Sequence, residues 1–128
     1  MTQEEKDLLI KDLCARLPYH IRVKVWLKDG TTEEGLLDLQ HNYGNVLQDA
    51  FYYNKIKDIK PYLRPMSSMT EEEKEEYCQL QQRVIYNSKR VINEDVTKYI
   101  NWCYKKHLDI NNLIPMELAI DATNLNIY

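Results

Sequence analysis

The sequence predicts an α+β fold: an N-terminal helix, a small, curled antiparallel sheet of about four strands, and C-terminal helices. Three features lead to this prediction. Apolar residues recur at helical spacing up to Pro18, then alternate with a period of two, and return to helical spacing after Thr70. Between the two halves, the prolines at positions 61 and 65 fix φ and remove backbone donors, so residues 60–65 are expected to run extended.

The chain has the length and apolar content of one domain. Its 128 residues, 44% of them hydrophobic, suffice to bury a core without disulfides or a metal. We expect one unit over residues 1–128, with a helix in 1–17, strands in 18–63 and a helical part in 64–128. Thr2 and Glu5 have the spacing of a capping box at the start of the first helix.

The strands are expected to follow this helix directly. Residues 19–28 alternate between aliphatic and polar side chains, which is typical of a strand with one buried face. Asp29 and Gly30 then predict a turn into a second strand, in which Gly35 indicates a bulge or a bend. Two further short strands are predicted before the prolines, and the last of them ends at Ile59.

Two helices are predicted in the second half of the chain. Thr70 and Glu73 repeat the capping-box spacing, and the helix that follows runs to about Tyr86. A further helix is expected from Asn93 to near Asp109. The remaining tail is predicted to be either a docking strand or an ordered coil.

The outward face of the first strand is the strongest candidate binding site. Three cations share this face with an imidazole and an indole, and such a set can hold phosphates while a base stacks on an aromatic ring. The candidate ligand-binding residues are His20, Arg22, Lys24, Trp26 and Lys28, extended by Lys57 and Arg64, with Lys55 and Lys60 as further cations. The alternative is a solvated sheet face, because any one-sided antiparallel strand alternates apolar and charged residues.

Tyrosine is abundant, at ten of 128 residues. Four tyrosines cluster around the loops and the proline-containing segment: Tyr43, Tyr52, Tyr53 and Tyr62. A tyrosine ring offers a large contact surface and one hydroxyl, so the cluster fits a protein interface or a nucleobase pocket. Tyrosine is also common at the edges of cores, and both interpretations stay open.

Composition indicates the compartment and argues against some functions. With 17 basic and 20 acidic residues, the net charge of −3 is not that of a protein coated with phosphate-binding charge. The three cysteines are far apart and lack a CxxC spacing, which indicates reduced thiols. Residues 1–5 do not form a signal sequence, and no apolar run approaches the roughly 20 residues that span a bilayer. We expect a cytoplasmic protein without a cofactor.

Cys103 and His107 lie one helical turn apart, yet neither a nucleophile nor a metal site is predicted. A zinc site needs about four ligands, and the other cysteines and histidines show no pairing that would supply them. Cys103 also lies near the C-terminal end of its helix, where the dipole does not lower the pKa of a thiol. The expected protein is not an enzyme and has no catalytic residue.

Three blocks of the sequence have a distinctive form. They are LCARLPY at residues 13–19, IKPYLRPMSSMTEEE at 59–73, and the HLD and LI elements within 102–122. Together they resemble a family of small uncharacterised proteins encoded by phages and prophages of gut Bacteroidetes. Asn111 and Asn112 depart from that family, which has an arginine and a glycine there, so the role of that arginine is not carried over. The resemblance implies no activity, but its phage setting implies a small protein that binds host components or host signals inside the bacterial cell.

A second likeness covers only the strands. The residues Leu27 to Gly30, Gly35, Leu37 and Asn45 to Leu47 are spaced like the first motif of Sm-like RNA-binding proteins. This likeness implies an SH3- or Sm-like barrel shape. His41 replaces the aspartate of that motif, and Ile56 to Asp58 replace the arginine-glycine pair of the second motif, so RNA binding is not implied.

The function that we expect is that of a non-enzymatic phage binding protein, in the sharpest version an anti-defence factor that sequesters an anionic host ligand such as a nucleotide signal. A homo-oligomer would suit this role. Two alternatives are a module that binds a host or phage protein through its tyrosines, and a protein that binds single-stranded nucleic acid through the barrel face.

Overall fold

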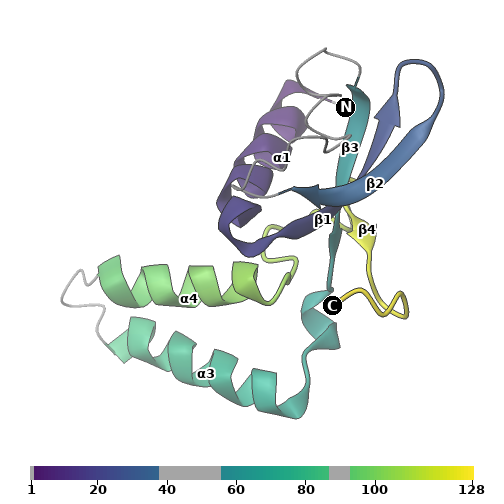
Figure 1. Cartoon of the computed structure of the whole chain (residues 1–128). Coiled ribbons are helices and arrows are strands. Elements are labelled where there is room, and N and C mark those ends of the chain that lie inside the picture. The colour runs from purple at the N-terminus through teal and green to yellow at the C-terminus, as the bar shows by residue number, and fades with distance from the viewer. Residues whose placement is uncertain (1, 38–55, 87–92) are drawn as a thin grey trace.

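The computed structural model of the chain describes residues 2–37, 56–86 and 93–128 (Figure 1). Its helices are α1 (Gln3–Arg16), α3 (Glu71–Tyr86) and α4 (Asn93–Lys105), and its strands are β1 (Ile21–Leu27), β2 (Thr32–Leu37), β3 (Ile56–Leu63) and β4 (Ile120–Asp121). The predicted α+β class is confirmed. Within the described parts of the chain, no helix is both long and apolar enough to cross a membrane.

The sheet has the strand order β2-β1-β3-β4, and β1 pairs antiparallel with both of its neighbours. β4 instead runs parallel to β3, with Tyr62 opposite Ile120. The prediction of an antiparallel sheet is therefore wrong for β4, because the tail returns to the sheet through a long connection and not through a hairpin. The described strands form an open sheet, not the barrel shape that the Sm-like spacing implies.

One face of this sheet is covered by α1 (Figure 1). The helix starts at the predicted capping box, in which the Glu5 amide donates to the Thr2 hydroxyl at 3.1 Å. Alternation along β1 then turns its aliphatic side chains towards the helix. The buried core consists of Leu9, Leu13, Ile21, Val23, Val25, Leu63, Leu113, Leu118 and Ala119.

β3 ends later than predicted, because it continues past Ile59 and through Pro61 to Leu63. Proline has no N–H to donate, and the ladder between β1 and β3 ends where Val23 faces Pro61. Beyond this point β3 pairs with β4. Of the bulge or bend predicted at Gly35, the bulge is wrong: the pairing of β1 with β2 is continuous there, and the irregularity lies between β1 and β3 at Trp26 and Leu27.

Arg64, directly after β3, joins the sheet to both C-terminal helices. Its N–H donates to the carbonyl of His107 at 2.8 Å, and its carbonyl accepts from the N–H of Asp109 at 2.8 Å. Its guanidinium donates to both carboxylate oxygens of Glu73, at 2.7 and 2.9 Å. Glu73 also closes the predicted capping box of α3, because it accepts from the N–H of Thr70 at 3.0 Å.

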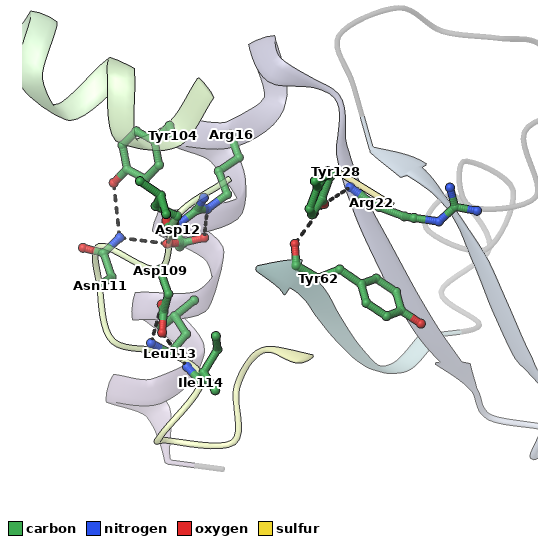
Figure 2. Close-up of polar contacts among 11 residues, drawn as sticks. Asp12, Arg16, Arg22, Tyr62, Tyr104, Asp109, Asn111, Leu113, Ile114 and Tyr128 are labelled. Atoms are coloured by element: carbon green, nitrogen blue, oxygen red, sulfur yellow. Dashed lines mark hydrogen bonds and ion pairs between the residues drawn. The ribbon is translucent and has the colours of Figure 1, made fainter. Parts of the chain in front are cut away.

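A second buried polar cluster joins α1 to the loop after α4 (Figure 2). The side chains of Asp12 and Arg16 are both fully buried, and Arg16 Nε donates to Asp12 Oδ1 at 2.6 Å. Arg16 Nη2 also donates to the carbonyl of Leu108 at 2.8 Å, and Asn111 Nδ2 donates to Asp12 Oδ2 at 2.8 Å. Asn112 follows with a φ of 60°, a left-handed conformation that asparagine tolerates better than most residues.

The Arg64–Glu73 pair predicts a specific acid dependence of stability. The hydrogen bonds from Arg64 lower the pKa of Glu73 from 4.5 to about 2. This stabilisation is therefore fully present above the ordinary carboxyl pKa and is lost as the pH falls through the folded-state value. Replacing Glu73 by glutamine should lower the free energy of unfolding at about pH 7 by about 2–3 kcal/mol, as measured by urea unfolding.

The matched control is Glu72→Gln, one position away on the exposed side of α3. It should change the free energy of unfolding by less than about 0.5 kcal/mol. The difference between the native chain and Glu73→Gln should shrink on acidification to about pH 2. A difference that persists undiminished there would contradict the assigned role of the ionised pair.

The Asp12–Arg16 cluster predicts a larger loss of stability. Asp12→Ala leaves the Arg16 guanidinium buried without its carboxylate, which should cost about 3–5 kcal/mol in the free energy of unfolding. Asp12→Leu combined with Arg16→Met removes both charges and should recover part of that loss. Asp7→Ala, on the exposed side of the same helix, serves as the control. A double variant less stable than Asp12→Ala would show that the pair is net stabilising.

Candidate functional site

The sheet face opposite α1 carries the side chains of Arg22, Lys24 and Trp26, all of them half-buried. They share this face because Ile21, Val23 and Val25 occupy the alternate, core-facing positions of β1. Lys60 of β3 joins them, since it lies directly opposite Lys24 in the sheet register. We call Arg22, Lys24, Trp26 and Lys60 the cationic face.

Trp26 lies at one end of the cationic face, within reach of both of its lysines. The Nζ atom of Lys24 is 5.4 Å from the centroid of its ring, and that of Lys60 is 5.7 Å from it. Like charges directly opposite each other on neighbouring strands are unfavourable, and attraction to the indole offsets part of this repulsion. The result is an aromatic ring with two ammonium groups within cation–π distance.

A carboxylate limits the positive charge of this face. Glu34 of β2 is the register partner of Lys24, and it accepts a hydrogen bond from the Tyr62 hydroxyl at 2.6 Å. Burial, followed by the hydrogen bond to Glu34, raises the pKa of Tyr62 to about 12. Tyr62 therefore stays protonated at neutral pH and holds Glu34 across β1. Asp58 of β3, the register partner of Trp26, places a second carboxylate on this face. A ligand would meet three cations beside two carboxylates, of which Glu34 is held by Tyr62.

Tyr128 closes the gap that Pro61 leaves between β1 and β3 (Figure 2). Its hydroxyl accepts from the N–H of Arg22 at 3.0 Å and donates to the carbonyl of Tyr62 at 2.9 Å. Its ring stacks on His107 with a centroid distance of 3.9 Å. Figure 2 shows the side chains of Arg22 and Tyr62 extending in the same direction, away from the Asp12 cluster.

The other predicted binding residues lie around or outside the cationic face. Lys28 and Lys57 are exposed near its far end, where the pairing of β1 with β3 is irregular. His20 lies at the opposite end with a φ of 58°, just before β1. Arg64 lies beyond the end of β3, and its guanidinium binds Glu73.

Of the four tyrosines predicted to form an interface, one lies in the described part of the chain. Tyr62 is 7% exposed and bound to Glu34, so it offers little contact surface. The other three, Tyr43, Tyr52 and Tyr53, lie outside the described residues, as does Lys55.

Sequence reasoning missed the roles of Glu34, Tyr128 and Asn111. The Tyr128 contact joins positions 106 residues apart, and no local pattern encodes it. The Asp12–Arg16 pair was missed as well: its spacing of four residues fits a helical pair, but the spacing does not show that the pair is buried.

Burial keeps the side chains of Cys103 and His107 uncharged at neutral pH. Burial raises the pKa of the Cys103 thiol to about 11, so the sulfur is protonated at neutral pH and a weak nucleophile. Burial, together with the charges of Arg16 and Arg64, lowers the pKa of His107 to about 4, so the imidazole is neutral. Across residues 2–37, 56–86 and 93–128, no cluster of histidine, cysteine, aspartate or glutamate side chains could hold a metal ion.

Comparisons of the chain with protein-family models, with curated proteins and with solved structures find no match. The functional interpretation therefore depends on the chemistry of the cationic face and of the surfaces around it.

The Tyr128 hydroxyl joins β1 to β3, so its removal should lower the stability of the protein. Tyr128→Phe leaves the N–H of Arg22 and the carbonyl of Tyr62 without this partner, so the free energy of unfolding should fall by about 1–2 kcal/mol. Amide hydrogen exchange at Arg22 should accelerate as well. Tyr19→Phe, before β1, is the control. Unchanged exchange at Arg22 in Tyr128→Phe would rule the bridge out.

Proposed function

We propose that this protein is a non-enzymatic binding protein whose cationic face captures a small anionic ligand that carries an aromatic ring, of the nucleotide class. The observation that supports this proposal is the Trp26 indole with the ammonium groups of Lys24 and Lys60 within 5.7 Å of its centroid, on a sheet face that α1 does not cover. One aromatic surface beside several cations matches the two chemical parts of a nucleotide.

Each part of the site has a role in this proposal. A base stacks on the indole and takes the place of one ammonium group there, and the displaced lysine then meets a phosphate. The guanidinium of Arg22, two positions along the strand from Lys24, binds phosphate oxygens through paired N–H donors. Glu34 accepts from an exocyclic amino group, which favours bases that carry one.

Sequestration of a host nucleotide signal in the bacterial cytoplasm is the biological form of this proposal. The resemblance to phage-encoded proteins implies a small protein that binds host components or host signals, and this supports the proposal. Single-stranded nucleic acid presents the same bases and phosphates, so the titrations must compare both kinds of ligand.

Binding can be measured by the fluorescence of Trp26. The protein has two tryptophans, and Trp102→Phe leaves Trp26 as the sole tryptophan, whose emission is excited selectively at wavelengths that tyrosine does not absorb. Cyclic and linear mononucleotides, cyclic dinucleotides, a single-stranded oligonucleotide and inorganic phosphate are titrated into this variant. A nucleotide should quench the emission by stacking, whereas phosphate alone should leave it nearly unchanged. If no nucleotide or oligonucleotide binds, by fluorescence or by calorimetry, the proposal fails.

Variants of the cationic face should weaken the binding in a defined order. Trp26→Ala removes the stacking surface and should raise the dissociation constant, measured by calorimetry, about 5- to 100-fold. Lys24→Ala and Lys60→Ala should each raise it about 3- to 10-fold. Lys11→Ala, an exposed lysine on α1, is the matched control and should change nothing. A tighter oligonucleotide complex that weakens steeply with salt would instead indicate single-strand binding.

A further inference from the structure

Asp58 lies beside the indole of the cationic face. In the sheet register it is opposite Trp26, and it lies two positions along β3 from Lys60. Side chains that face each other on neighbouring strands have Cβ atoms about 4.5–5.5 Å apart, so the carboxylate lies next to the ring. A base that stacks on the indole therefore brings one of its edges to Asp58.

A backbone hydrogen bond fixes the orientation of this carboxylate. Asp58 is half-buried, and its Oδ1 accepts from the N–H of Ile59 at 2.9 Å. Among the described residues, its Oδ2 has no hydrogen-bond partner. A carboxylate offers about four lone-pair sites, so the two oxygens can still accept two hydrogen bonds from a ligand.

The neighbouring cations do not pair with Asp58. Within the described parts of the chain, no ion pair includes Asp58, Lys24 or Lys60. Lys28 and Lys57 are exposed at the same end of the sheet, and no carboxylate of the described residues pairs with either of them. A ligand therefore reaches the carboxylate of Asp58 without breaking an ion pair.

Two other carboxylates near this face are bound to side chains or turns of the protein. Glu34 Oε1 accepts from the Tyr62 hydroxyl at 2.6 Å, and Glu34 lies opposite Lys24, not opposite the indole. Asp29 Oδ1 accepts from the N–H and the hydroxyl of Thr31 in the turn after β1, at 2.9 and 2.6 Å. Asp58 is therefore the carboxylate best placed to meet a base on the ring.

The face also has a direction that matches a nucleotide. Trp26 and Asp58 form one end of it. Lys24 and Lys60 lie two positions further along the strands, about 7 Å away, and Arg22 lies two positions beyond Lys24. A base at the Trp26 end thus directs its phosphates towards the three cations and away from the carboxylate of Asp58.

We propose that the cationic face selects guanine nucleotides, and that Asp58 accepts hydrogen bonds from the Watson–Crick edge of a guanine stacked on Trp26. This inference rests on the nucleotide binding proposed above and adds the identity of the base. Guanine carries two donors side by side on that edge, N1–H and the N2 amino group, and they match the two oxygens of a carboxylate. The second hydrogen of the amino group remains for Glu34.

The other bases fit the carboxylate less well. Adenine and cytosine each have a ring nitrogen that only accepts beside their amino group, and uracil has one N–H between two carbonyls. Next to a carboxylate, which also only accepts, such an atom finds no donor. A site that hydrogen-bonds its ligand rejects analogues that leave polar groups unpaired. Asp58 therefore separates guanine from bases that stacking alone does not distinguish.

Calorimetry of the full chain with four ribonucleoside 5′-monophosphates tests the choice of base, because the four share their sugar and phosphate. Guanosine monophosphate should bind at least about 20-fold more tightly than adenosine or uridine monophosphate. Inosine monophosphate keeps N1–H but lacks the amino group, and it should bind about 3- to 10-fold more weakly than guanosine monophosphate. Equal affinities would overturn the selection of guanine and leave nucleotide binding standing, whereas no binding of any nucleotide would overturn both proposals.

Asp58→Asn tests the residue itself. The amide oxygen can still accept from the N–H of Ile59, but the amide NH₂ group now meets the donors of guanine. The ratio of the dissociation constants of adenosine and guanosine monophosphates should fall at least about tenfold, and this ratio cancels any gain in phosphate affinity from the lost charge. Asp7→Asn, exposed on α1, is the matched control and should keep the native ratio. Circular dichroism confirms that both variants are folded, and an unchanged ratio in Asp58→Asn would overturn the proposal.

Discussion

Three parts of the structure meet at Arg64. Its backbone pairs with the loop after α4, so the line of β3 continues into the helical part of the chain. Its guanidinium binds the carboxylate of Glu73, and that carboxylate also caps α3. One residue therefore bonds the end of β3 to the start of α3 and to the loop after α4. Apolar packing holds α1 to the sheet, whereas polar bonds hold much of the rest.

Polar bonds also hold together the strands that carry the cationic face. Pro61 ends the β1–β3 ladder, and the hydroxyl of Tyr128 then joins the two strands beside Arg22. Tyr62 of β3 reaches across β1 and binds Glu34 of β2 by a hydrogen bond. Both tyrosines therefore stiffen the strands that carry Arg22, Lys24 and Lys60. A site on strands that are bonded from both sides is better organised for a ligand than the same side chains on a loop.

Local sequence patterns accounted for the elements and for the composition of the face. The threonine–glutamate pairs marked the starts of α1 and α3, since a capping box satisfies backbone donors within four residues. Alternation placed Arg22, Lys24 and Trp26 on one side of β1, because successive side chains of a strand point to opposite faces. Proline chemistry predicted the extended backbone at residues 60–65, although it did not show that β3 includes Pro61.

The sequence by itself determined the helices, the core-facing residues of β1 and the clustering of cations with an indole, because each of these follows from backbone geometry over a few residues. Tertiary structure alone decided that the tail adds a parallel strand, that the Arg64 guanidinium binds Glu73 of α3, and that Glu34 enters the cationic face. These outcomes depend on contacts between positions remote along the chain or on separate elements. Such contacts form only when burial of the core brings those elements together, and no local period encodes them.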